Sequence, residues 1–280
     1  MQPVVRPLFL LHRDLDLRAA LARIPGQPYA LTMVGDWEAL GEALRRAPLT
    51  AIPVVDPHLG SSGDGQPSET LLALLRTFPS VAVVAALPVQ PETGDAVRTL
   101  AEWGVAEIVD LVRERTPEAL ARRLRLVEGR TMERLLRRAL PESIPARSRA
   151  LLTVAAEVVA WGGQAPELAD SLGVSERTVA RWCARADLPP ARRLLAWMRV
   201  LLAAELLDDP GRSIAGVARA CGYSGAASLK GALRGLLQMT PQELRTRGAF
   251  DLAARTFSRE LMERREQARA RGKPARAWLN

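Results

Sequence analysis

The sequence has few of the residues that build disulfide frameworks, metal centres or catalytic sites. Its two cysteines, Cys183 and Cys221, lie in unrelated contexts, so they give neither a disulfide framework nor the spacing of zinc ligands. Only two histidines are present, His12 and His58, and no nucleophile elbow, metal cluster or dinucleotide fingerprint accompanies them. We therefore expect no enzyme, no metal site and no cofactor.

Long hydrophobic runs are also absent. No stretch approaches the ~18 consecutive apolar residues that indicate a membrane span. The first apolar run, Leu8 to Leu11, is too short for the core of a signal peptide. These absences predict a cytoplasmic protein that does not contact a membrane.

Aromatic residues make up only 4% of the chain, so Leu, Val and Ala must supply most of the core. Apolar residues reach 48% and charged residues 25%, a balance typical of globular rather than disordered chains. A length of 280 residues is enough for two ordinary domains.

The charge is unevenly distributed along the chain. Residues 1–115 hold 10 Lys/Arg against 14 Asp/Glu, whereas residues 116–280 hold 29 against 17. A strongly basic second half suggests a polyanionic partner, and nucleic acid is the usual one. Charge alone leaves open a second interpretation, an arginine-rich composition without any partner.

The first half alternates short apolar strands with helical stretches. Five such units predict an α/β domain with a doubly wound, five-stranded parallel sheet, because crossovers place helices on both faces. The expected strands are 8–11, 29–34, 51–55, 81–87 and 105–109, and the expected helices are 19–24, 36–46, 68–76, 93–103 and 117–127.

From Ser148 onward the pattern indicates only helices, so the second half is expected to be all-α. The expected helices are 148–161, 165–172, 176–186, 191–207, 214–221, 225–237, 241–247 and 251–271. The predicted domains are 1–128, a linker at 129–147, a helical domain at 148–247 and a basic C-terminal helix or tail at 248–280. We expect the arginine-rich tail to be a solvated helix with a frayed end, and a phosphate-contacting role stays open.

Residues 166–182 have the pattern of a helix-turn-helix. An amphipathic helix turns inward Leu168 and Leu172, Gly173 permits a left-handed corner, and Ser175 caps a second helix. That second helix presents Arg177, Thr178, Arg181 and Arg185 outward.

The pattern recurs at residues 213–224, with Ser213 as a helix cap, Gly222 at the corner and Ser224 as the next cap. A long apolar helix, Leu194 to Leu207, lies between the two units. Two units joined by one rigid helix fit successive major grooves, ~34 Å apart.

Roughly residues 148–247 resemble the AraC/XylS family of bacterial transcription regulators. The most specific segment runs from Ile214 to Arg245, with Gly222-Tyr223-Ser224 at its corner and Thr240-Pro241 opening its last helix. The family usually has aromatic residues at the positions of Cys183, Leu229, Leu233, Leu237 and Leu244. These are core replacements that leave the expected fold unchanged, and both cysteines are expected to be buried.

The resemblance implies double-stranded DNA as the partner. Gly and Ala on the second recognition helix cannot form bidentate hydrogen bonds to bases, so we expect base reading from the first unit and phosphate contacts from the second. The candidate residues are Ser175, Arg177, Thr178, Arg181 and Arg185 in the first unit and Ser228, Lys230 and Arg234 in the second. The alternative is that the arginines merely solvate a helix face.

The first half resembles the receiver domain of response regulators. Asp56 ends the third strand, at the position of the phosphorylated aspartate. The receiver's acidic pair, Ser/Thr and Lys are replaced by His12-Arg13, Ala85-Ala86 and Asp110-Leu111. Phosphoryl transfer needs a metal and a cation to stabilise charge. We therefore expect a pseudo-receiver in which Asp56 is a vestigial phosphoacceptor with a turn or capping role.

Asp14 and Asp16 leave open the recovery of one metal ligand by a one-turn shift.

The two resemblances together give the hypothesis of a sequence-specific transcription regulator whose first domain forms homodimers or receives a protein or small-ligand signal. The alternative is an adapter that has lost specific DNA reading and binds DNA only non-specifically.

Overall fold

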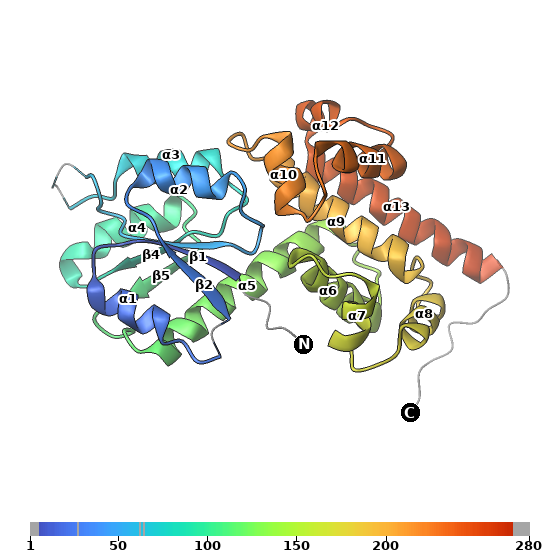
Figure 1. The fold of residues 1–280 in the computed structure, drawn as a ribbon, viewed down its shortest axis with the longest axis horizontal. Coiled ribbons are helices and arrows are strands. Elements are labelled where there is room, and N and C mark those ends of the chain that lie inside the picture. The colour runs from blue at the N-terminus through green and yellow to red at the C-terminus, as the bar shows by residue number, and fades with distance from the viewer. Residues whose placement is uncertain (1–5, 27, 62, 64, 271–280) are drawn as a thin grey trace. The chain divides into compact units, whose positions relative to one another are not determined.

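The computed structural model describes residues 6–270 except 27, 62 and 64. Its contacts divide the chain into two compact units (Figure 1). The first unit consists of the residues up to Thr131 together with Asp209–Ala220, and the second of Met132–Asp208 together with the residues from Cys221 onward. The last ten residues of the predicted tail lie outside the described part of the chain.

The first unit contains a five-stranded parallel sheet in the order β2-β1-β3-β4-β5. Its strands are β1 (Arg6–Leu11), β2 (Tyr29–Met33), β3 (Ile52–Val55), β4 (Val84–Leu87) and β5 (Glu107–Asp110). The central strands β3 and β4 are buried along their whole length, as strands covered on both faces must be. The order confirms the predicted doubly wound sheet of the receiver and flavodoxin type.

Helices cover both faces of the sheet. On one face α1 (Leu15–Ala22) and the first half of α5 (Pro117–Ala139) share a core with β1, β3 and β4. On the other face lie α2 (Trp37–Leu44), α3 (Glu69–Thr77) and α4 (Gly94–Glu102), the last preceded by the short turn η1 (Pro91–Thr93). Leucine, valine and alanine fill both layers, as the shortage of aromatics predicts.

Helix α5 continues beyond the predicted end at residue 127. It runs unbroken through Gly129 to Ala139, so most of the predicted linker is helical. Leu124 and Val127 pack against the sheet, and the later residues Met132 and Leu136 are buried as well. A glycine in a helix costs only about 1 kcal/mol relative to alanine, which the burial of these apolar residues outweighs.

The second unit is entirely helical where it is described. Its helices are α6 (Ala146–Ala160), α7 (Ala165–Ser171), α8 (Glu176–Arg185), α9 (Ala191–Leu207), α11 (Ala226–Leu237), α12 (Pro241–Arg247) and α13 (Ala249–Ala270). Helix α9 is its centre, because it is buried almost from end to end and contacts each of the other six. One further helix, α10 (Ile214–Ala220), belongs to the first unit.

Helix α13 is part of the core of the second unit, so the prediction of a solvated basic helix is wrong. Its first four turns bury Phe250, Phe257 and Leu261, and the Phe257 ring lies 5.3 Å from that of Trp197 on α9. Asp208 caps the helix by accepting hydrogen bonds from the Ala249 and Phe250 amides at 2.7 and 2.9 Å. The arginines that dominate its composition occupy the remaining face.

Among the described helices, none combines the length and the hydropathy that crossing a bilayer requires.

Candidate nucleic-acid interface

Helices α7 and α8 form the first predicted helix-turn-helix. Gly173 occupies the corner with a φ of +65°, a conformation that costs glycine little. Ser175 caps α8 by accepting a hydrogen bond from the Thr178 amide at 3.3 Å. Leu168 and Val179 are buried on the inner sides of the two helices. The corner and cap inferred from the sequence are both confirmed.

The outer side of α8 carries exposed cations. Arg177, Arg181 and Arg185 are exposed, whereas Thr178 is half-buried. Within the described residues, neither Arg177 nor Arg181 has an ion-pair partner. The hydroxyls of Thr178 and Ser175 lie 3.1 Å apart, so both are engaged at the helix start. Helix α8 therefore presents two uncompensated guanidinium groups beside its capped N-terminus.

The second predicted helix-turn-helix consists of α10, a corner and α11. Ser213 caps α10 by accepting from the Gly216 amide at 3.0 Å, and Gly222 takes a φ of +71°. The expected cap at Ser224 is wrong, because the residue flanking α11 is Gly225. The Ser228 hydroxyl reaches back, donating to the Gly225 carbonyl at 2.9 Å and accepting from its amide at 3.3 Å. This pair of bonds replaces a side-chain cap.

The outer side of α11 carries fewer exposed cations than that of α8. Lys230 and Arg234 are exposed, and neither makes a salt bridge to any described residue. Ser228, the third candidate on this helix, is half-buried and already bonded to Gly225. The leucines that replace aromatics on the inner side, Leu229 and Leu233, are fully buried. The predicted core replacements thus keep the packing of the helix.

Helices α8 and α11 belong to the same unit and both contact α9. In Figure 1, α8 lies near the start of α9 and α11 nearer its end. The 17 residues of α9 span about 25 Å at 1.5 Å per residue. One buried helix therefore separates α8 and α11 within a single packed body.

Polar contacts fix α9 to its neighbours at several points. Arg199 donates to the Gly163 carbonyl at 3.0 Å, and Arg245 donates to the Leu207 carbonyl at 3.2 Å. Glu260 of α13 accepts two hydrogen bonds from Arg193, at 2.7 and 2.8 Å, and one from the Trp197 indole at 2.7 Å. These bonds hold the scaffold that carries α8 and α11.

The strand ends of the first unit hold the predicted vestigial phosphoacceptor. Asp56 follows β3, and its carboxylate accepts a hydrogen bond from the His58 amide at 2.9 Å, which is the geometry of a local turn. His12 occupies the end of β1, with Nε2 3.1 Å from the Ala86 carbonyl and Nδ1 accepting from the Asp14 amide at 3.0 Å. Among the described residues no cluster of acids, histidines or cysteines could hold a metal ion.

The other acids at the strand ends are also used by the local backbone. Asp14 caps α1, and the hydrogen bond from the Leu17 amide, with the Arg115 guanidinium nearby, holds the pKa of its carboxyl below the usual value. Asp110 accepts from the Val89 and Val112 amides at 3.1 and 2.9 Å. A capping Asp14 paired with Arg115 is a poor metal ligand. This arrangement argues against Asp14 replacing one of the metal-binding acids of a receiver.

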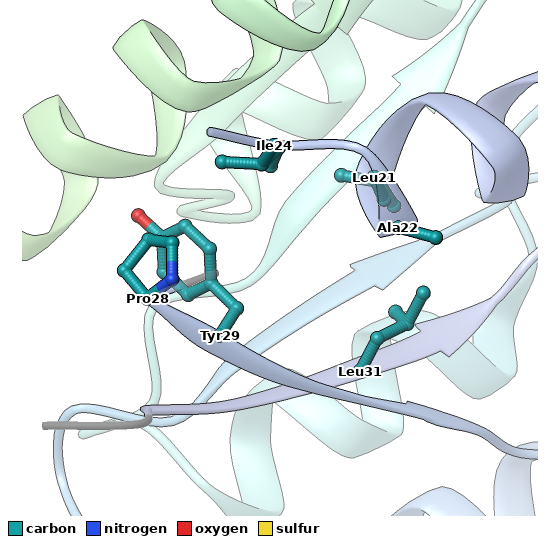
Figure 2. A pocket seen from close by; sticks show the side chains of 6 residues that line it. All are labelled: Leu21, Ala22, Ile24, Pro28, Tyr29 and Leu31. Carbon is teal, nitrogen blue, oxygen red and sulfur yellow. The ribbon is translucent and has the colours of Figure 1, made fainter. Parts of the chain in front are cut away.

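A small cavity of about 170 Å³ opens between the end of α1 and β2 (Figure 2). Its lining is apolar apart from one phenol and consists of Leu21, Ala22, Ile24, Pro28, Tyr29 and Leu31. Burial, together with the nearby Glu128 carboxylate, raises the pKa of Tyr29, so the phenol stays protonated. Ligand sites usually exceed about 300 Å³, and this cavity offers no second group for chemistry.

Comparisons with known proteins find one matching domain within the second half of the chain. Residues 168–247 match a family model described as a helix-turn-helix domain. No curated protein matches the chain. Two solved structures are similar: full-length FixJ from B. japonicum, with 14% identity over 72% of this chain and 97% of that one, at a TM-score of 0.40; and the Salmonella typhimurium response regulator RcsB, with 17% identity over 69% and 98%, at 0.32.

Proposed function

Because residues 168–247 form a helix-turn-helix domain of the AraC type, we propose that this protein is a sequence-specific transcription regulator that reads the major groove of double-stranded DNA. The observation that carries the proposal is α8 itself, capped at Ser175 and exposing Arg177 and Arg181 without ion-pair partners among the described residues. Arginine is the side chain that most often recognises guanine by two hydrogen bonds.

The two recognition helices divide the work. Helix α8 reads bases, chiefly through Arg177, Thr178 and Arg181, with Arg185 and Ser175 at its ends. Helix α11 contributes phosphate contacts from Lys230 and Arg234, with Ser228 confined to the helix start by its bonds to Gly225. Phosphate contacts position a protein on the duplex, whereas base contacts specify the sequence.

The receiver-like unit serves as a platform for dimerisation or for a protein or small-ligand signal and is not phosphorylated by the receiver route. Support comes from the strand ends, where a His12 ring bonded to Ala86 and Asp14 stands in place of metal-binding carboxylates. Asp56 is bound into a turn by His58. Without a metal, the charge that develops during phosphoryl transfer has no stabilising partner.

Selection from sheared genomic DNA at two salt concentrations tests the proposal. The full-length protein should enrich fragments that share one motif, and the enrichment should survive the higher salt. Enrichment without a motif that vanishes as salt rises would show that only phosphate contacts remain, and it would refute sequence-specific reading.

Arg181→Ala and Lys230→Ala form a matched pair for the proposed division of work. Arg181→Ala should lower affinity by ~1–3 kcal/mol at one base pair of the motif and relax specificity there. Lys230→Ala should weaken binding to all sequences alike and reduce the salt slope by ~1. If Arg181→Ala weakened all DNA equally, base reading would not lie at that residue.

A second candidate function is an adapter that binds DNA only non-specifically. It is favoured by α11, whose outer side near the start consists of Gly225, Ala226, Ala227 and Gly231. The genomic selection separates the two candidates, because only the regulator returns a motif.

A further inference from the structure

Sequence and contacts place helix α10 in different parts of the protein. By sequence it lies inside the helix-turn-helix domain matched at residues 168–247, as the first helix of the second helix-turn-helix. By its contacts, the segment Asp209–Ala220 belongs to the first compact unit, together with the parallel sheet. The sequence did not predict this grouping, since Asp-Pro-Gly-Arg-Ser at 209–213 has the composition of a surface turn.

A buried polar network joins this segment to the end of α3 and to the loops that follow α2 and α3 in the first unit. Asp209 accepts hydrogen bonds from the Ser80 amide at 2.9 Å and the Ser80 hydroxyl at 2.5 Å. Arg212 donates to Asp209 at 2.8 Å and to the Ala47 carbonyl at 2.6 Å. Both charged side chains are 0% exposed, and the Gly211 amide adds a bond to the Thr77 carbonyl at 3.1 Å.

We call the part of the first unit up to Thr131 the sheet unit. Two glycines permit a close approach of the segment Asp209–Ala220 to it. A Cβ at Gly216 would overlap the Arg45 carbonyl oxygen, and a Cβ at Gly211 would lie 2.7 Å from the Phe78 ring. Helix α10 therefore presents bare backbone to the loop after α2. Such close contact requires glycine at these two positions, whereas a turn exposed to solvent would accept residues with a Cβ atom.

Charged residues are almost never fully buried without partners, because removing each ion from water is costly. Burying Asp209 and Arg212 here is tolerated because each finds its hydrogen bonds on the sheet unit. Such a network adds little net stability, because the cost of desolvation offsets much of the attraction between the charges. Removing one member leaves the other buried and uncompensated.

We propose that the sheet unit takes part directly in DNA binding by holding α10, so that Asp209 and Arg212 are positioning residues for the second helix-turn-helix. This inference rests on the proposed function. Only residues 221–225 separate α10 from α11, with Gly222 at a φ of +71°. Fixing α10 consequently restricts where Lys230 and Arg234 can meet the phosphates, and a signal that reaches the sheet unit gains a route to the DNA contacts.

Gly216→Ala tests the contact from the backbone side. In a free helix, alanine would be more stable than glycine, but here its methyl group collides with the Arg45 carbonyl oxygen and displaces α10. Gly129→Ala is the matched control, because Gly129 is exposed within α5 and nothing lies near its added Cβ. Arg212→Lys tests the same contact from the other side, since lysine keeps the charge but cannot bond Asp209 and Ala47 together.

The readout is the salt dependence of DNA binding, which reports the phosphate contacts of α11. Loss of Lys230 and Arg234 contacts lowers the slope by ~0.9 each, so the affinity ratio between 50 and 200 mM salt should fall about 12-fold. Gly216→Ala and Arg212→Lys should each lower the slope, and adding Lys230→Ala or Arg234→Ala to either should then change nothing further. Circular dichroism shows which variants remain folded.

The outcomes are distinct. If the wild type binds DNA but both variants keep its slope, and Lys230→Ala still acts in their background, the sheet unit does not position α11 and the inference is wrong. If the wild type itself shows no salt-dependent binding, the proposed function fails. Equal effects of Gly129→Ala and Gly216→Ala would also overturn the inference, because they would trace the change to helix propensity.

Discussion

Asp56 illustrates how the neighbours of a residue decide its role. It stands after β3, where a receiver carries its phosphoacceptor, yet its carboxylate is bonded to the His58 amide. His12 and Arg13 stand at the predicted positions of a receiver's metal-binding acids, and Arg115 pairs with the nearby Asp14. Under the proposed function, these neighbours replace the acids that would hold a metal to orient and neutralise a phosphoryl donor.

Asp56 should therefore gain no phosphoryl group when the protein is incubated with acetyl phosphate and Mg²⁺. Intact-mass spectrometry measures this directly, with a competent receiver domain in the same reaction as the positive control. A mass increase of one phosphoryl group that disappears in Asp56→Asn would refute the pseudo-receiver proposal.

Glu260 should make stability depend on pH. Burial raises the pKa of its carboxyl, but hydrogen bonds from Arg193 and Trp197 outweigh burial and hold the pKa below the usual value. A lowered pKa in the folded state adds stability that is complete above the unfolded pKa, about 4.3, and is lost as the pH falls through the folded pKa. Glu260→Gln should thus lower the melting temperature most near neutral pH.

The difference between Glu260→Gln and the wild type should shrink as the pH falls from the unfolded pKa of about 4.3 through the lower folded pKa, where the wild-type carboxyl itself takes up a proton. Glu263→Gln is the control, because Glu263 is exposed on the same helix. A Glu260→Gln deficit that stayed constant from pH 7 to pH 3 would show that the charge contributes nothing.

At the scale of elements, helix caps follow from the local sequence, whereas the burial of a whole helix depends on what packs against it. The caps at Ser175 and Ser213 and the corners at Gly173 and Gly222 agree with the sequence patterns, because each rests on bonds within a few residues. The prediction that α13 is a solvated helix is wrong. Its composition is rich in arginine, but its apolar residues recur every three or four positions and pack on α9.

Phe257→Ala should destabilise the protein by ~3–5 kcal/mol, the usual cost of emptying a buried aromatic site. Phe257 is 0% exposed and packs on Trp197. Denaturant unfolding measures the change. Met262→Ala, on the same helix but 50% exposed, should stay within ~0.5 kcal/mol of the wild type. A mild effect of Phe257→Ala would return α13 to the role of a solvated tail.

At the scale of the whole molecule, the compact units do not follow chain order. The segment Asp209–Ala220 joins the sheet unit although it lies between α9 and α11, both of which belong to the second unit. Units that are discontinuous in sequence should still open cooperatively, since cooperativity follows contacts rather than chain order.

Native-state hydrogen exchange should therefore place the Gly211 amide with the sheet. Its bond to the Thr77 carbonyl should open together with the Asp56 amide, which is bonded to the Leu11 carbonyl at 2.8 Å. The Ser61 amide, in a surface turn, provides the fast-exchanging reference. Exchange of Gly211 at the rate of Ser61 would show that the segment is not held by the sheet unit.

Features that depend on local patterning could be predicted from the amino-acid sequence alone. Alternating apolar strands and helices predicted the five-stranded parallel sheet, and the paired corners with their caps predicted two helix-turn-helix units. The candidate residues Arg177, Arg181, Lys230 and Arg234 are exposed as expected, because helical periodicity fixes which side a residue occupies. Their contacts with DNA remain predictions.

The partners of α10 and the burial of α13 emerged only once the chain was folded. The Ser80–Asp209 pair spans 129 positions, and no local pattern specifies a partner at that distance. A charged pair in a polar turn is usually solvated, and only hydrogen-bonding groups supplied by the folded sheet unit made its burial favourable.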